Sequence, residues 1–240
     1  METTEGHLLG GRLRYAQPRR GFRSGIEPIL LAASIPARPG ERVLEGGSGA
    51  GAILLCLAAR VPGVRGLGVE RDPALADLAR NNAIANGYDG LDFLTADIIA
   101  LPEVGCFDHA GANPPYHPAG GTAASDPSVE AAKRAGAGLV ASWAAALAGR
   151  LRPGGTLTLI LPVSGLAEAL AALGACGCGA ASLLPLWPKA GREAKLMILR
   201  GIRGRRGTTR LLPGLVLHRP DGSFTDEAEA CLRAGASLAF

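Results

Sequence analysis

The chain has 240 residues, of which 48% are hydrophobic, with 35 glycines, 17 prolines and a net charge of +4. At roughly 150 residues per domain, this length and apolar content provide a substantial core, which excludes a disordered tail protein, and the glycines keep no collagen-like period. No run reaches the roughly 18 apolar residues of a membrane-spanning helix and no export signal opens the chain, so we expect a cytoplasmic protein without membrane contact.

Two predicted segments come before a regular alternation of strands and helices. Residues 17–25 form a basic, turn-rich piece, and the apolar segment 26–35 opens with Glu27 and Pro28, which are typical of a first helical turn. From residue 42 onward, strands are expected at 42–45, 66–70, 91–96 and 107–112, and helices at 51–61 and 73–86. Strands that alternate with helices predict a parallel sheet.

A segment rich in proline and glycine, 113–128, precedes the second series of elements. Helices are expected at 129–151, 166–173 and 225–234, a turn at 152–155, and strands at 156–161, 181–186, 196–202 and 211–217, with Thr225 as the N-cap of the last helix. We predict one open, doubly wound α/β domain over 1–240. It consists of an N-terminal cap segment (1–40), a core (41–202) and a basic C-terminal extension (203–240).

A glycine-rich loop follows the first strand of the alternation. Gly47, Gly49 and Gly51 stand where that strand turns into its helix, and glycines there let backbone amides approach a ligand that a Cβ would keep away. Through Ala52 the run also satisfies the G-x-G-x-x-A dinucleotide fingerprint. The loop alone is therefore consistent with either NAD or S-adenosylmethionine.

Carboxylates stand at the ends of the first three strands of the alternation. Glu70 closes the second strand, where it can accept hydroxyl protons from a ribose. Asp97 follows the third strand and is placed to meet an exocyclic amine such as that of adenine, and Glu45 could meet a charged amino acid end of the ligand. Three such carboxylates beside a glycine loop predict a nucleoside site.

The tetrapeptide Asn113-Pro114-Pro115-Tyr116 directly follows the fourth strand, and we predict that these four residues are catalytic. The two prolines fix two φ angles and remove two backbone donors, which leaves carbonyl acceptors on a rigid ledge. The Asn113 side-chain oxygen and the Pro114 carbonyl can accept both N–H groups of a planar amine, so that its nitrogen lone pair faces an incoming methyl group. Tyr116 can stack on the ring that carries the amine.

Residues 45–51, Glu70, Asp97 and the tetrapeptide resemble the ordered motifs of class I S-adenosylmethionine-dependent amino-methyltransferases. Residues 19–27 and the tail at 188–229 are similar to the tRNA1(Val) adenine-37 N6-methyltransferase group. The resemblance implies S-adenosylmethionine as cofactor and a Rossmann-like, seven-stranded, mainly parallel sheet with helices on both faces. The cofactor-binding residues it implies are Arg23, Gly25, Glu45, Gly47, Gly49, Gly51, Glu70, Arg71, Asp97, Ile98 and Asn113. Gly46 departs from the family, which usually has a larger apolar residue there.

Basic residues gather in the tail. From Lys189 to Arg219 there are nine Lys or Arg and one acid, Glu193. This asymmetry suggests a polyanionic partner, and on composition alone it fits an exposed, arginine-rich strand pair kept soluble by its charges equally well. With the resemblance, we expect that partner to be RNA, and tRNA in particular. The residues expected to contact it are Lys133, Arg134, Arg192, Arg203, Arg205, Arg206 and Arg210. The chain is consistent with a monomer or a homodimer.

Metal chemistry has little support in the sequence. The five cysteines are odd in number and scattered, which is typical of reduced thiols, and the four histidines have no H-x-x-x-H spacing. We therefore expect no bound metal.

The predicted function is S-adenosylmethionine-dependent methylation of an exocyclic nucleobase amine, with adenine N6 in tRNA as the first candidate. Because close versions of the tetrapeptide also serve guanine N2 and glutamine N5 enzymes, rRNA guanine methylation and N5 methylation of a protein glutamine are alternatives. A non-catalytic RNA-binding module is a third hypothesis. An NAD-dependent oxidoreductase is disfavoured because no Tyr-x-x-x-Lys proton donor is present.

Overall fold

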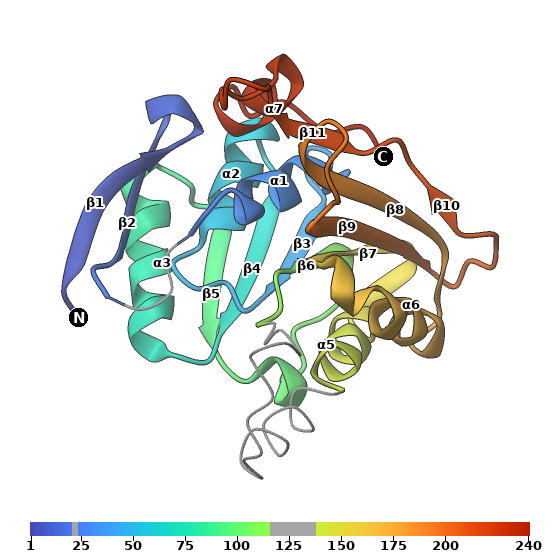
Figure 1. Cartoon of the computed structure of the whole chain (residues 1–240). Helices are drawn as coiled ribbons and strands as arrows, with labels where there is room; N and C mark the ends of the chain where they lie inside the picture. The colour runs from blue at the N-terminus through green and yellow to red at the C-terminus, as the bar shows by residue number, and fades with distance from the viewer. Residues whose placement is uncertain (21–23, 116–137) are drawn as a thin grey trace, which may run out of the picture.

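The central feature of the fold is a nine-stranded sheet, seen in a computed structural model that describes residues 1–20, 24–115 and 138–240 (Figure 1). The strand order is β10-β8-β9-β7-β6-β3-β4-β5, and β11 pairs with another part of β8. The bounds are β3 Arg42–Gly46, β4 Arg65–Glu70, β5 Leu91–Thr95, β6 Phe107–Ala112, β7 Leu151–Pro162, β8 Cys178–Lys189, β9 Leu196–Arg203, β10 Arg210–Leu211 and β11 Leu215–His218. Only β9 runs antiparallel to its neighbours, so the mainly parallel sheet is confirmed.

Helices cover both faces of the sheet, as predicted (Figure 1). On one face lie α1 Glu27–Ser34, α2 Ala52–Arg60, α3 Pro73–Ala85 and α7 Asp226–Leu232, and on the other lie α5 Leu139–Ala148 and α6 Leu166–Ala175. Successive residues of β3 supply both layers, because side chains alternate along a strand: Val43 joins the first core and Leu44 the second. Within the described ranges, no helix combines the length and apolarity needed to cross a bilayer.

Capping side chains begin two helices where the sequence predicts. The Asp72 carboxylate accepts the Ala74 N–H at 2.8 Å at the start of α3, and the Thr225 hydroxyl accepts the Ala228 N–H at 3.2 Å at the start of α7. The predicted helix 129–151 is helical over Leu139–Ala148, and its first nine residues lie outside the described part of the chain.

An antiparallel hairpin of β1 Thr3–Leu8 and β2 Leu13–Pro18 forms where the sequence predicted no strands. Its turn contains Gly10 at φ 63° and Gly11 at φ 99°, a conformation that favours glycine. The hairpin lies against α3 at one end of the molecule (Figure 1).

Two further predictions of local structure need correction. The turn expected at 152–155 is a bulge inside β7, since Phe107 pairs with Leu151 while His109 pairs with Thr156. The strand expected at 211–217 is split into β10 and β11. Pro213 lacks the N–H needed for a ladder, and Gly214 turns the backbone with a φ of 88°.

Candidate active site

Four segments with predicted roles meet at the carboxyl edge of the sheet. Strands β6, β3, β4 and β5 are neighbours and all parallel, so the residues that follow them lie along one edge. This edge brings together the glycine loop after β3, Glu70 at the end of β4, Asp97 after β5 and Asn113 after β6. In open α/β sheets that edge is where ligands bind.

The three glycines of the loop have positive φ angles but different surroundings. Gly47, Gly49 and Gly51 have φ values of 65°, 53° and 88°. A Cβ at Gly51 would lie 3.0 Å from Phe93, and one at Gly47 would lie 2.6 Å from Trp143, whereas one at Gly49 would meet none of the described residues within 4 Å. Packing therefore accounts for two of the glycines, and Gly49 presents an open face.

Glu70 is held in one orientation by the backbone around it. Its Oε2 accepts the Gly49 N–H at 2.8 Å, and its Oε1 accepts the Asp72 N–H at 2.9 Å. Each carboxylate oxygen keeps a further lone pair for a ligand hydroxyl. The same side chain thus shapes the glycine loop and presents an oriented acceptor beside it.

Glu45 lies buried under the loop, with 1% of its surface exposed. Its Oε2 accepts the N–H of Leu54 in the first turn of α2 at 3.2 Å. Burial raises the pKa of this carboxyl well above its ordinary value, and the nearby Glu70 adds to the rise. A cation placed near Glu45 would oppose that shift.

The residues after β5 form a short 3-10 helix, Ile98–Ala100. Asp97 caps it, with Oδ1 accepting the Ile99 N–H at 2.9 Å. Asp97 is exposed, Ile98 is buried, and Arg71 at the end of the neighbouring strand is exposed. The ligand role predicted for Asp97 therefore shares the side chain with a capping role.

The tetrapeptide begins where β6 ends. Asn113 is half-buried, Pro114 is buried and Pro115 is exposed at the same sheet edge as the glycine loop, while Tyr116 lies outside the described residues. Arg23 also lies outside them. Gly25 is described, and a Cβ there would run into the carboxylate of Glu27. The sheet edge thus places Asn113 in the same region as the predicted cofactor residues.

Asn82 was not among the site residues predicted from the sequence, and it connects the N-terminal hairpin to the glycine loop. Its Oδ1 accepts the Ala16 N–H at 2.9 Å, and its Nδ2 donates to the carbonyls of Ala16 at 2.9 Å and Ala50 at 3.0 Å. One turn later, Asn86 bonds both backbone groups of Arg14 in the same way. Asparagine is unfavourable inside a helix, so its presence there is a weak sequence signal that its side chain hydrogen-bonds to another part of the chain.

The predicted RNA-contacting residues do not share one location. Arg203 ends β9 opposite Cys178, the first residue of β8, so Arg205 and Arg206 lie at the amino edge of the sheet, away from Asn113. Arg205, Arg206 and Arg210 are exposed. Arg192 lies in the turn after β8, at the other end of that strand, whereas Lys133 and Arg134 lie outside the described residues.

Comparisons with known proteins agree with this geometry. The family model "Methyltransferase small domain" matches residues 27–162. A curated tRNA1(Val) (adenine(37)-N6)-methyltransferase of Aeromonas hydrophila is 31% identical over 210 residues, 87% of each chain. A release factor glutamine methyltransferase of Cereibacter sphaeroides is 33% identical over 198 residues, 75% of this chain and 69% of its own.

A solved structure supports the fold. The crystal structure of a predicted O-methyltransferase, protein Atu636 of Agrobacterium tumefaciens, matches with a TM-score of 0.73 and 24% identity. The match covers 89% of this chain and 99% of that one. The family match excludes the NAD-dependent oxidoreductase that the glycine loop alone left open.

The residues at the carboxyl edge fit S-adenosylmethionine, the cofactor of class I methyltransferases. Gly49 leaves open space above the loop, Glu70 presents oriented acceptors, and the Oγ of Ser48 is buried without a hydrogen-bond partner within the described part of the chain. Strands β3 to β9 correspond to the seven strands predicted for the class I fold, and β10 and β11 are additional strands. The matched family and the solved structure agree with that fold. The chain therefore belongs to the methyltransferase small domain family and is an S-adenosylmethionine-dependent methyltransferase with the class I fold.

Proposed function

We propose that this enzyme methylates the exocyclic amine of a nucleobase, and that its substrate is adenine N6 in tRNA. The observation that carries the proposal is the position of Asn113-Pro114-Pro115, which follows β6 at the same sheet edge as the glycine loop. The Aeromonas hydrophila relative, whose name specifies adenine N6 and tRNA, supports the choice of substrate.

The ledge acts by positioning the amine. When bound, S-adenosylmethionine supplies a methyl group on a positively charged sulfur. The Oδ1 of Asn113 and the carbonyl of Pro114 would accept the two N–H groups of the substrate, which reduces delocalisation of the nitrogen lone pair and aims it at the methyl group. As the N–C bond forms the C–S bond breaks, which leaves a neutral thioether, and the methylated nitrogen then loses one N–H proton to solvent. Because the prolines hold these acceptors rigid, little reorganisation is needed at the moment of transfer. Tyr116 is proposed to stack on the base.

In this proposal, different residues contact different parts of the cofactor. Glu70 holds the ribose hydroxyls, and Asp97 with Ile98 lies beside the adenine. Glu45 faces the amino acid end through the glycine loop, where a ligand ammonium group would favour its charged form. Arg23, Gly25 and Arg71 complete the proposed set of cofactor contacts.

RNA is proposed to reach beyond the active site to the basic tail. Arg205, Arg206 and Arg210 are exposed near β10, where they can contact phosphates, while Arg192 lies at the opposite end of β8. An RNA of tRNA size could contact both regions, since phosphate contacts need no base readout. Arg203 is less available, because its guanidinium donates to the Cys176 carbonyl.

A protein glutamine is the second candidate substrate. The Cereibacter sphaeroides relative is named a release factor glutamine methyltransferase, and a carboxamide fits the same pair of acceptors. A peptide substrate, however, gives no reason for the exposed arginines of the tail.

Mass spectrometry of nucleosides and of tryptic peptides distinguishes the two substrates. In cells that lack the gene, we expect tRNA to lose N6-methyladenosine, and the wild-type gene to restore it while the Asn113→Ala gene does not. Unchanged nucleosides together with a lost N5-methylglutamine would replace the proposed substrate with a protein.

A further inference from the structure

Trp143 on α5 packs directly on the glycine loop. A Cβ built on Gly47 would lie 2.6 Å from Cη2 and 3.0 Å from Cζ3 of its indole, shorter than the 3.4–4 Å of ordinary contact. The benzene ring of Trp143 therefore occupies the space that any side chain at position 47 would need. Gly47 is thus required both by its φ of 65° and by the neighbouring ring.

The position of Trp143 is fixed by the packing of its helix. Leu147, one turn further along α5, is fully buried, and its Cδ2 would lie 3.3 Å from a Cβ on Gly46. Ile98, which follows the predicted adenine contact Asp97, would lie at the same distance from that Cβ. Because Gly46 has no Cβ to press on these two side chains, α5 can approach the loop this closely.

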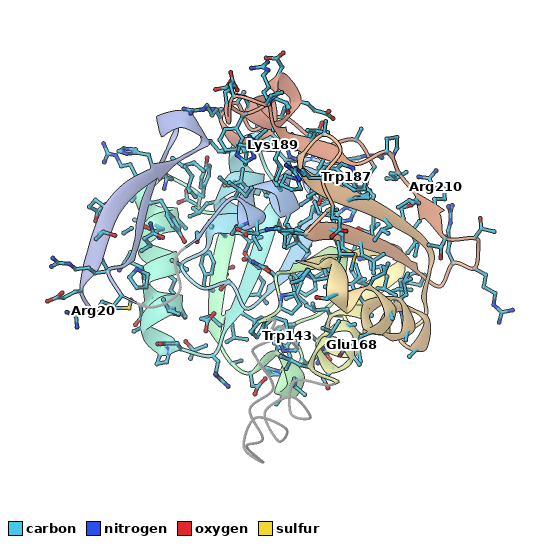
Figure 2. All side chains as sticks on the ribbon, in the orientation of Figure 1. Arg20, Trp143, Glu168, Trp187, Lys189 and Arg210 are labelled. Atoms are coloured by element: carbon cyan, nitrogen blue, oxygen red, sulfur yellow. The ribbon has the colours of Figure 1, made fainter. Side chains whose placement is uncertain are left out.

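The indole also borders the carboxyl edge of the sheet. Trp143 is half-buried, in contrast to Leu147, and Figure 2 shows it between α5 and the ends of the central strands. Gly47 itself is exposed, and Gly49 has open space on its Cβ side. A ligand that lies across the loop would therefore have the aromatic side chain of Trp143 at one side.

We propose that Trp143 is a cofactor-positioning residue, whose indole forms the side of the S-adenosylmethionine site next to Gly47. The proposal rests on the cofactor binding at the glycine loop. A rigid aromatic side chain supplies apolar contact area and keeps water from that side of the ligand. Trp143 lies on α5, the helix that follows the proposed catalytic tetrapeptide, and it contacts the glycine loop, so it connects these two parts of the site.

Tryptophan fluorescence tests the proposal directly. The chain has two tryptophans, and Trp187 on β8 is a suitable one to remove, because its Nε1 donates to the Pro213 carbonyl and Figure 2 shows it apart from Trp143. In the Trp187→Phe protein, S-adenosylmethionine should change the emission of Trp143 with the midpoint that calorimetry gives. In the Trp143→Phe protein, the emission of Trp187 should stay constant.

The outcomes separate this proposal from the cofactor site itself. Calorimetric binding without an emission change in the Trp187→Phe protein would overturn the role of Trp143 and leave the cofactor site intact. An absence of calorimetric binding to the wild-type protein would overturn both.

A double-mutant cycle measures the contact between the ring and the loop. Gly47→Ala should weaken cofactor binding through backbone strain and a clash with the indole, whereas in the Trp143→Ala background only the strain remains. We expect the loss of affinity to be roughly tenfold larger when Trp143 is present. Equal losses in both backgrounds would contradict the proposal.

Gly49→Ala is the matched control for that cycle. Its φ of 53° imposes similar strain, but its Cβ would meet no atom within 4 Å in the part of the chain that the structure describes. Gly49→Ala should therefore weaken binding by the same factor with and without Trp143. Circular dichroism of each variant checks that the fold persists.

Discussion

Glu45 is the predicted site residue whose pKa is shifted furthest from its ordinary value. Its pKa is raised in the folded state by burial, so the folded protein holds the proton more tightly than the unfolded chain. The stability associated with this proton is complete below the unfolded pKa and is lost as the pH rises toward the folded pKa. Glu45→Gln keeps an acceptor for the Leu54 N–H and removes the titration.

We therefore expect the Glu45→Gln protein to gain unfolding free energy relative to wild type at pH 8, and to gain less at pH 4. Urea denaturation at the two pH values measures the difference. Parallel pH profiles for the two proteins would contradict the buried, protonated form of Glu45. Weaker cofactor binding by Glu45→Gln would in addition support its proposed role at the amino acid end of the ligand.

Asn82 tests the connection between the hairpin and the glycine loop. Asn82→Ala leaves the Ala16 backbone and the Ala50 carbonyl without their partners, so the free energy of unfolding should fall by about 2–3 kcal/mol. Asn81→Ala, an exposed neighbour on the same helix, should change it by less than about 0.5 kcal/mol. Equal effects in urea denaturation would show that the three hydrogen bonds contribute little.

The site could be predicted from the sequence in part, and the reason lies in what each residue contacts. Glu70, Asp97 and Asn113 stand at strand ends, so their location at one sheet edge follows from the parallel alternation alone. The packing of Gly47 on Trp143 and of Gly51 on Phe93 depends on residues distant in the chain, and no local pattern reports it. The same holds for the bonds of Asn82.

At the scale of elements, His109 joins β6, β7 and the residue before β3. Its Nδ1 lies 2.8 Å from the Thr156 hydroxyl and its Nε2 3.0 Å from the Glu41 carboxylate. Burial lowers the pKa of His109 below its ordinary value, although Glu41 opposes the shift. The stability it contributes is therefore complete above the unfolded pKa of about 6.5 and is lost as the pH falls below it.

Replacing His109 by Gln should flatten that dependence. We expect the wild-type unfolding midpoint to fall more steeply from pH 7.5 to pH 5.5 than the His109→Gln midpoint, although the variant is less stable at pH 7.5. Thermal denaturation at both pH values provides the comparison. A variant with the wild-type slope would show that His109 does not titrate in this range.

The elements were predicted best where local signals and burial agree. Strand β6 has its predicted bounds, and α3 begins at Pro73 as predicted. The hairpin was missed because its strands are only partly buried and pair with each other, although Gly10-Gly11 is the kind of signal that marks a hairpin turn. The bulge in β7 arises from pairing with β6, which the sequence of 152–155 does not encode by itself.

Across the whole molecule, Arg205 and Arg206 lie toward the amino edge of the sheet and the proposed catalytic ledge lies at the carboxyl edge. If RNA contacts both, the charge-reversed variant Arg205→Glu/Arg206→Glu should bind tRNA more weakly. The slope of log K against log salt should also decrease by about one for each lost phosphate contact. Arg60 is not a suitable site for the control substitution, because its guanidinium donates to backbone carbonyls at the end of α1. The control is Arg65→Glu, because Arg65 is an exposed arginine at the start of β4.

Filter binding or fluorescence anisotropy at several salt concentrations measures both quantities. An unchanged slope in the Arg205→Glu/Arg206→Glu protein would remove the tail from the RNA-binding surface. It would leave the active site unaffected, since these residues are distant from Asn113 by their register.

Asn113 is proposed to position the amine for methyl transfer and to contribute little to cofactor affinity, although the family resemblance also places it among the cofactor-binding residues. The most direct measurement combines calorimetry of S-adenosylmethionine binding with transfer of a labelled methyl group to tRNA, for wild type, Asn113→Ala and the exposed control Asn81→Ala. We predict that Asn113→Ala lowers turnover by roughly a hundredfold or more with nearly unchanged cofactor affinity, while Asn81→Ala behaves as wild type. Turnover that persists in Asn113→Ala would show that Asn113 does not position the amine.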